Sequence, residues 1–353
     1  MKRMGIVLST GCAIALVAAL VPAVASGVSV AAPGGSDISL DDRKKPKPTK
    51  SPRPSKSPKP TPPKGAPVPE QARAIEKWIQ AQPKTYEKAT STFVFTVDPE
   101  LAGGPWERMA VDTAKAAFEV HALLGQPVTR PYRVYVGWGR PWLERTVPKD
   151  ACPVIFDFAT AAACQGSDVI YTHFALNRSL NPSLTPMGDP GPNMRFNTLG
   201  LVGHELTHHV QQSLYPRKPN PAPEAGQWMI EGWAVMTQTL IAMRHNKIPY
   251  TQARDHALRL INAQCTSMKL RDLLAPTFWT NCVYVSGFLA MEYLMWKTGD
   301  MKAGWTWVSQ DAATAREGFS QAFGMDLDTF MDEADAYVKQ ELLLWAWRQL
   351  PTS

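Results

Sequence analysis

The chain is poor in cysteine, and none of its cysteines has the spacing that a cysteine zinc site needs. Only 5 cysteines occur in 353 residues, and no C-x-x-C motif is present. Zinc fingers and zinc ribbons hold their metal through such pairs. A metal site in this chain would therefore have to use histidine and carboxylate ligands. The sequence also contains no visible internal repeat, so it gives no support to an array of repeated units.

The globular part also lacks an excess of charge of either sign. Residues 1–64 contain 11 Lys and Arg but only 3 Asp and Glu, so the rest of the chain contains 26 basic and 28 acidic residues. The formal net charge of +6 therefore arises from the N-terminal tail. Basic runs of this kind are usually solvated tails. The charge therefore gives no reason to expect a nucleic-acid partner.

The first 25 residues are predicted to be a secretory signal peptide. A basic start is followed by an apolar run over residues 6–24, and Ala23-Val24-Ala25 offers a cleavage site before Ser26. An uncleaved anchor is the alternative, because the run approaches the roughly 20 residues that span a bilayer. Gly11, Pro22 and the weak apolarity of the run favour cleavage. We therefore expect a secreted, extracellular protein.

Residues 26–66 are predicted to form a disordered linker rich in proline and lysine. Its second part, residues 41–66, consists largely of Pro, Lys, Ser and Thr. Such a segment cannot bury enough apolar surface to offset the entropy lost on ordering. It therefore serves either as a solvated spacer or, through its positive charge, as a tether to an anionic cell envelope.

The four cysteines beyond the signal peptide are predicted to form two disulfides. They are Cys152, Cys164, Cys265 and Cys282. An even number of cysteines in an exported chain implies a disulfide framework. The local pairing, Cys152 with Cys164 and Cys265 with Cys282, closes loops of 12 and 17 residues' separation. Each bond could contribute about 3 kcal/mol to stability.

Residues 67–349 are predicted to form one α+β domain, present as a monomer. Alternating β-forming residues indicate strands at 92–97, 132–136 and 169–171, and apolar periodicity indicates helices at 71–82 and 106–124. Every strong pattern beyond residue 194 is helical. This order predicts a small N-terminal mixed sheet followed by a mainly helical C-terminal lobe.

The helical lobe begins with a His-Glu-x-x-His motif formed by His204, Glu205 and His208. Residues i and i+4 of a helix lie on one face, so both imidazoles can reach one zinc ion at roughly 2.0–2.1 Å. Glu205 is rotated by about 100° around the helix from His204. Its carboxylate would lie beside the metal, where it can act as a general base for water.

The surrounding residues favour a metal site over two core histidines that flank an unrelated glutamate. An apolar stripe runs along the helix at Leu199, Val202, Leu206, Val210 and Leu214. The helix also contains Gly200 and Gly203, each of which costs about 1 kcal/mol relative to alanine. These glycines indicate that another backbone approaches this helix closely, as expected if the helix is buried.

Glu231 is the predicted third ligand. Position 214 is Leu, so the longer motif with a third histidine is absent. Glu231 follows His208 by 23 residues and starts an apolar helical run, whereas the rival Glu224 belongs to a loop with several prolines.

The sequences His204-Glu205-Leu206-Thr207-His208 and Glu231-Gly232-Trp233-Ala234 resemble the gluzincin zinc metallopeptidases. The first segment is similar to thermolysin-like proteases and the second to aminopeptidase-type and collagenase-like members. Weaker similarity at residues 284–294 and 322–330 extends the resemblance over about residues 90–345. It concerns the clan as a whole, because position 235 is Val where thermolysin relatives have Asp.

The resemblance implies a zincin-like fold and a site for one Zn²⁺ ion, held by His204, His208 and Glu231. Glu205 would be the general base. Tyr284 would stabilise the oxyanion, since gluzincins commonly use a tyrosine downstream of the third ligand; the alternative is a packing tyrosine. The expected function is a secreted zinc-dependent peptidase acting on proteins or peptides. The alternative is an inactive, zinc-stabilised binding module at the cell surface.

Overall fold

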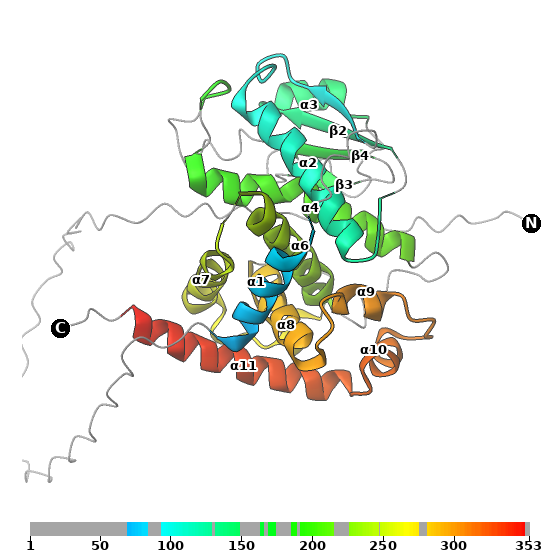
Figure 1. Cartoon of the computed structure of the whole chain (residues 1–353), viewed down its shortest axis with the longest axis vertical. Helices are drawn as coiled ribbons and strands as arrows, with labels where there is room; N and C mark the ends of the chain where they lie inside the picture. The colour runs from blue at the N-terminus through cyan, green and yellow to red at the C-terminus, as the bar shows by residue number, and fades with distance from the viewer. Residues whose placement is uncertain are drawn as a thin grey trace, which may run out of the picture.

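A small sheet with its helices packs against a larger lobe of helices in the computed structural model (Figure 1). The structure describes the residues in the ranges 69–83, 93–128, 131–148, 163–165, 169–173, 185–188, 191–214, 226–246, 248–274 and 281–349. The predicted signal peptide and linker lie outside these ranges. No helix in the described part is long and apolar enough to cross a membrane.

Helices make up most of the described fold. The α-helices are α1 (Glu70–Ala81), α2 (Pro105–Leu123), α3 (Arg140–Thr146), α4 (Gly191–Leu214), α6 (Gln227–Asn246), α7 (Tyr250–Leu260), α8 (Asn281–Thr298), α9 (Ala303–Val308), α10 (Ala315–Phe323) and α11 (Leu327–Arg348). A π-helix, η3 (Ile261–Cys265), and a 3₁₀ helix, η4 (Leu270–Leu273), connect α7 towards α8. Helix α1 packs on α6 and α8, so the first helix belongs to the C-terminal lobe (Figure 1).

The sheet has four strands in the order β1-β2-β4-β3. Strands β1 (Phe93–Val97), β2 (Tyr132–Gly137) and β4 (Val169–His173) are parallel, and β3 (Ala163–Gln165) is antiparallel to β4. The predicted mixed sheet and α+β class are therefore confirmed. Strand β3 was not predicted, because three residues are too few to show an alternating pattern.

Helix α6 packs at unusually short range against two other helices, α4 and α8. A Cβ atom added to Gly203 of α4 would lie 2.2 Å from Cδ1 of Ile241 on α6. A Cβ added to Gly232 of α6 would lie 2.3 Å from the carbonyl carbon of Gly287 on α8. Helices α6 and α8 therefore touch backbone to backbone. The backbone approach predicted at Gly203 is wrong, because the element next to this glycine presents a side chain, that of Ile241.

A buried ion-pair network connects α7, α8 and α11 on the far side of this helix pair. The Arg254 guanidinium lies 2.9 Å from Oε1 of Glu292 and 2.9 Å from Oε2 of Glu341, and it donates to the Tyr337 hydroxyl at 3.0 Å. The Tyr337 hydroxyl also donates to Glu292. Removing one partner of a buried charge pair typically costs about 3–5 kcal/mol, so this network fixes the three helices relative to one another.

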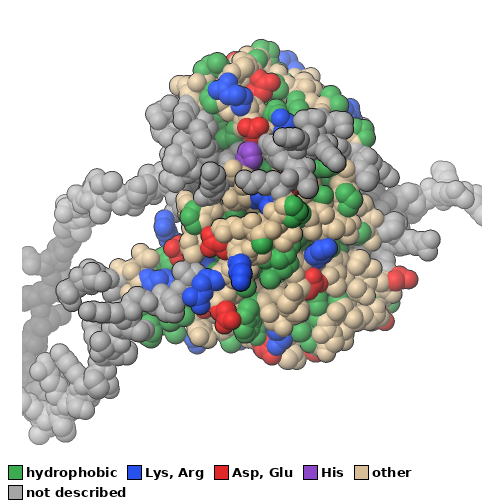
Figure 2. All heavy atoms as spheres, viewed as in Figure 1, with side chains coloured by type: hydrophobic (Ala, Val, Ile, Leu, Met, Phe, Trp, Pro, Cys, Tyr) green, Lys and Arg blue, Asp and Glu red, His purple; other side chains and the backbone are tan. Residues whose placement is uncertain are grey.

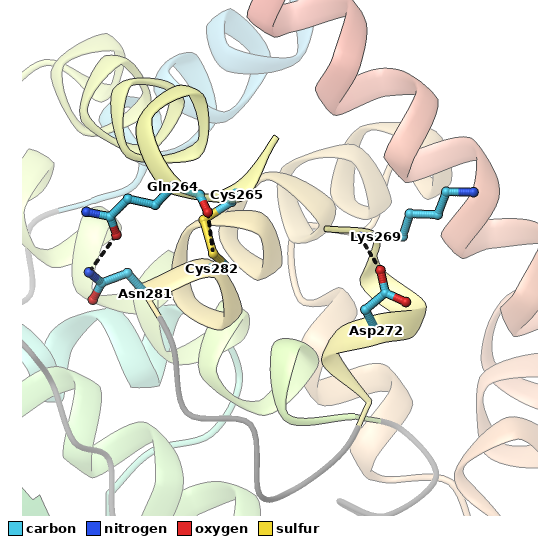
Figure 3. Close-up of a disulfide and its surroundings, with 6 residues drawn as sticks. All are labelled: Gln264, Cys265, Lys269, Asp272, Asn281 and Cys282. Carbon is cyan, nitrogen blue, oxygen red and sulfur yellow. Dashed lines mark hydrogen bonds between the residues drawn. A yellow bond between two sulfur atoms is a disulfide. The ribbon is translucent and has the colours of Figure 1, made fainter. Parts of the chain in front are cut away.

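The disulfide Cys265–Cys282 joins the end of η3 to the start of α8, with the two Cα atoms 5.6 Å apart (Figure 3). Beside it, Asn281 donates a hydrogen bond to Gln264 at 3.1 Å. This half of the predicted pairing is confirmed. Cys152 lies outside the described residues, so its pairing with Cys164 remains a prediction.

Charged side chains of both signs are interspersed on the face shown in Figure 2. This distribution agrees with the near balance of acidic and basic residues beyond the N-terminal tail.

We expect mass mapping of the non-reduced, exported protein to find Cys152 linked to Cys164, besides the Cys265–Cys282 bond. The reason is the short loop that each local pairing closes. Free thiols at Cys152 and Cys164 in the exported protein would contradict this pairing.

We expect Gly287→Ala to lower the free energy of unfolding by about 1–3 kcal/mol, as overpacking of a core does. The new Cβ would lie 2.0 Å from the carbonyl oxygen of Trp228. Because this oxygen belongs to the backbone, a change of side-chain rotamer cannot relieve the overlap. Gly318→Ala in α10 is the matched control, since its Cβ would find its nearest neighbour at 3.4 Å. That control should be neutral or stabilising by about 0.5–1 kcal/mol. Urea unfolding of both variants measures the difference; equal stabilities would refute the tight contact.

Candidate metal centre

The two motif histidines point the same way from consecutive turns of α4. The Nε2 atoms of His204 and His208 lie 3.1 Å apart, and both side chains are buried. This is the geometry expected from i, i+4 spacing on a helix. The apolar stripe of the same helix packs into the core through Val202, Leu206 and Val210, which turns the histidines towards α6.

Glu231, on the second turn of α6, completes a triangle with the two imidazoles. Its Oε2 lies 3.1 Å from Nε2 of His204 and 3.3 Å from Nε2 of His208. Ligands at about 2.0–2.1 Å from a tetrahedral zinc ion lie about 3.3–3.4 Å from one another. The buried group of His204, His208 and Glu231 could therefore hold a metal ion. The rival ligand Glu224 lies outside the described residues.

Two glutamine side chains form hydrogen bonds with the ligand atoms that do not face the triangle. Nδ1 of His208 lies 2.9 Å from Oε1 of Gln211, and Nε2 of Gln227 donates to Oε1 of Glu231 at 2.9 Å. Sequence reasoning missed both glutamines. Their positions carry a signal, because Gln211 is at i+3 from His208 and Gln227 is at i−4 from Glu231, the spacings at which helical side chains meet.

The electrostatics of the triangle couple its members strongly. Burial disfavours charge on His208, but the neighbouring Glu231 carboxylate outweighs burial and raises the pKa of His208 to about 9. Burial lowers the pKa of His204. Burial also acts to raise the pKa of Glu231, but the two histidines hold that pKa well below its ordinary value. The cluster thus requires positive charge at its centre, from a proton or a metal ion.

Glu205 is the member of the motif that does not join the triangle. It is fully buried, and neither carboxylate oxygen has a hydrogen-bond partner in the part of the chain that the structure describes. Burial raises the pKa of Glu205 to about 8, His208 opposes the rise, and Glu231 adds to it. A buried carboxylate without partners is costly. A cation held by the triangle next to Glu205 would offset that cost.

Tyr284 lies at the edge of the same cluster, on the first turn of α8. Its ring centroid is 6.1 Å from that of His204, at an interplanar angle of 37°. The ring is only partly buried. The Gly232–Gly287 contact brings this turn of α8 alongside Glu231, so the structure places the candidate tyrosine near the metal ligands.

Two further histidines near the motif lie away from the triangle. His209 packs its ring against Tyr132 of β2, with centroids 4.8 Å apart. His121 of α2 lies behind α4, where its Nε2 is 3.3 Å from Oγ1 of Thr207. Burial lowers the pKa of His121 to about 4, so this histidine is neutral at physiological pH. Neither residue belongs to the metal-binding group.

Comparisons with known proteins give no match for this chain, whether to protein-family models, to curated protein sequences or to solved structures.

We expect Glu231→Gln to lower zinc occupancy sharply, because an amide oxygen carries no charge and the triangle loses its only carboxylate. Glu224→Gln is the matched control and should leave occupancy unchanged. Metal analysis after dialysis against zinc buffers of defined free concentration measures both. Equal occupancy in the two variants would remove Glu231 from the site.

Proposed function

We propose that the chain is a zinc-dependent peptidase of gluzincin type, built on a zincin-like domain. One observation carries the proposal: three buried ligand atoms lie 3.1–3.3 Å apart. The Glu205 carboxylate, which has no hydrogen-bond partner among the described residues, interacts electrostatically with His208 and Glu231 of this cluster. A metal-binding motif could arise without catalysis. A buried carboxylate that neither binds the metal nor accepts a hydrogen bond from the described residues needs another explanation, and general-base catalysis supplies one.

Zinc is the metal that this donor set fits best. Two imidazole nitrogens and one carboxylate oxygen form the His₂Glu set found in catalytic zinc sites, in which a fourth position stays open for water or substrate. Structural zinc sites have four protein ligands and are closed. Zinc held by His204, His208 and Glu231 would act as a Lewis acid and lower the pKa of a water molecule.

The residues around the metal would transfer the proton and stabilise the oxyanion. The Glu205 carboxylate would accept a proton from the attacking water and return it to the leaving amine, a role that requires free oxygens. The Tyr284 hydroxyl would donate a hydrogen bond to the oxyanion of the tetrahedral state, where such donors are worth most. His204 and His208 would keep their Nε2 atoms available to the metal throughout.

The substrate would be a protein or peptide outside the cell, met by a secreted monomer that the basic linker can hold near the cell envelope. The alternative is an inactive binding module stabilised by zinc. Such a module has no use for Glu205, whose burial costs stability because it has no hydrogen-bond partner in the part of the chain that the structure describes. The presence of this carboxylate therefore favours the enzyme.

We expect Glu205→Gln to retain zinc and thermal stability but to lose peptidase turnover by about 10²–10⁴-fold or more, the usual worth of a positioned general base. The amide has the size of the carboxylate but cannot accept a proton at neutral pH. His208→Ala should instead lose both zinc and turnover. Hydrolysis of an unfolded casein-type substrate, with and without a chelator, is the measurement.

The wild-type protein provides the decisive control. Its hydrolysis should stop on treatment with chelator and return when zinc is restored. If the wild-type protein carries a full complement of zinc and hydrolyses no unfolded protein, the peptidase proposal is wrong and the binding module replaces it.

A further inference from the structure

Gln211 connects the two helices that carry the metal ligands. Its side chain is buried on α4, one turn beyond His208. Oε1 of Gln211 lies 2.9 Å from Nδ1 of His208, and Nε2 donates to the carbonyl oxygen of Ile230 at 3.0 Å. Ile230 immediately precedes Glu231 on α6. A single amide therefore bridges a ligand of one helix and the backbone next to a ligand of the other.

This bridge determines which nitrogen of His208 carries the proton. A backbone carbonyl can only accept a hydrogen bond, so the side of the amide that faces Ile230 must be its NH₂ group. The amide oxygen then faces Nδ1 of His208, and that nitrogen must donate. In a neutral imidazole the other nitrogen, Nε2, is left with a free lone pair. Nε2 is the atom that points at His204 and Glu231.

Gln227 acts on Glu231 in a related way. Its Nε2 donates to Oε1 of Glu231 at 2.9 Å, so one carboxylate oxygen is occupied and Oε2 faces the histidines. A glutamate at position 227 could not donate this bond at neutral pH and would repel Glu231. At position 227 the side chain thus needs an N–H donor that reaches across one helical turn, which the glutamine amide supplies.

We infer that Gln211 is a positioning residue for the metal: it couples the tautomer of His208 to the place of the Glu231 helix, so that both ligands face one point. The inference rests on the proposed zinc site, but it does not depend on catalysis. Partners behind a metal ligand of this kind typically change metal affinity by about 10–100-fold when they are removed.

The test compares Gln211→Leu with Gln211→Glu in the complete exported protein. Zinc affinity is measured by competition with a chromophoric chelator. Gln211→Leu removes the acceptor for His208 and should weaken zinc binding about 10–100-fold. Gln211→Glu restores an acceptor for Nδ1–H but no donor for Ile230, so it should recover part of the loss. The His208 tautomer is read independently from the ¹⁵N shifts of its ring in zinc-loaded protein.

Gln310→Leu is the matched control, since Nε2 of Gln310 also donates to a backbone carbonyl, that of Thr306 at 2.7 Å, in α9 and the turn after it. It should leave zinc affinity unchanged. Circular dichroism and zinc-free melting curves establish that each variant folds. Wild-type affinity in Gln211→Leu would overturn the inference, and so would a loss in Gln211→Glu as large as in Gln211→Leu.

The outcomes separate this inference from the proposed function. Tight zinc binding without hydrolysis in the wild-type protein would refute the peptidase and leave the affinity series intact. Normal hydrolysis with an unchanged affinity in Gln211→Leu would refute only the role of Gln211. A wild-type protein that does not bind zinc would refute both.

Discussion

The backbone contact between α6 and α8 at Gly232 and Gly287 is the constraint on which the centre depends. Glu231 precedes one of these glycines, and Tyr284 lies one turn before the other. The contact of Gly203 with Ile241 sets α4 against the opposite side of α6. Three helices that are separate in the sequence thereby bring their polar groups to one point. Larger side chains at these glycines would move the helices apart by more than the slack of a coordination bond, which is about 0.2 Å.

Around that point the protein buries charge that its own groups only partly compensate. Glu231 has two histidines and a glutamine amide as neighbours, whereas Glu205 has no hydrogen-bond partner among the described residues. In the Arg254 network of the same helical lobe, by contrast, the buried carboxylates of Glu292 and Glu341 each lie 2.9 Å from a guanidinium nitrogen. Glu205, which has no hydrogen bond on either oxygen within the described part of the chain, thus belongs to the site where we propose a cation and catalysis.

The sequence predicted those parts of the structure that depend on local spacing. The i, i+4 histidines, the glutamate at the start of an apolar helix, the alternating strands and the disulfide between Cys265 and Cys282 all have short-range signals. It did not predict β3, which is too short to alternate, or the bridge from Gln211 to Ile230. That bridge depends on how α4 and α6 meet, because Gln211 and Ile230 are 19 residues apart in the chain. The contact between Tyr284 and His204 likewise required the packing of α8, so only a resemblance could suggest it.

The disulfide has a mechanical consequence for the edge of the site. It fixes the Cα atoms of Cys265 and Cys282 5.6 Å apart, and Cys282 lies two residues before Tyr284. The first turn of α8 is therefore held by the disulfide at its start and by the Gly232–Gly287 contact one turn beyond Tyr284. These two contacts restrict movement of the Tyr284 backbone along, or away from, α4 and α6. The Tyr284 ring is thereby kept next to His204, with the two ring centroids 6.1 Å apart.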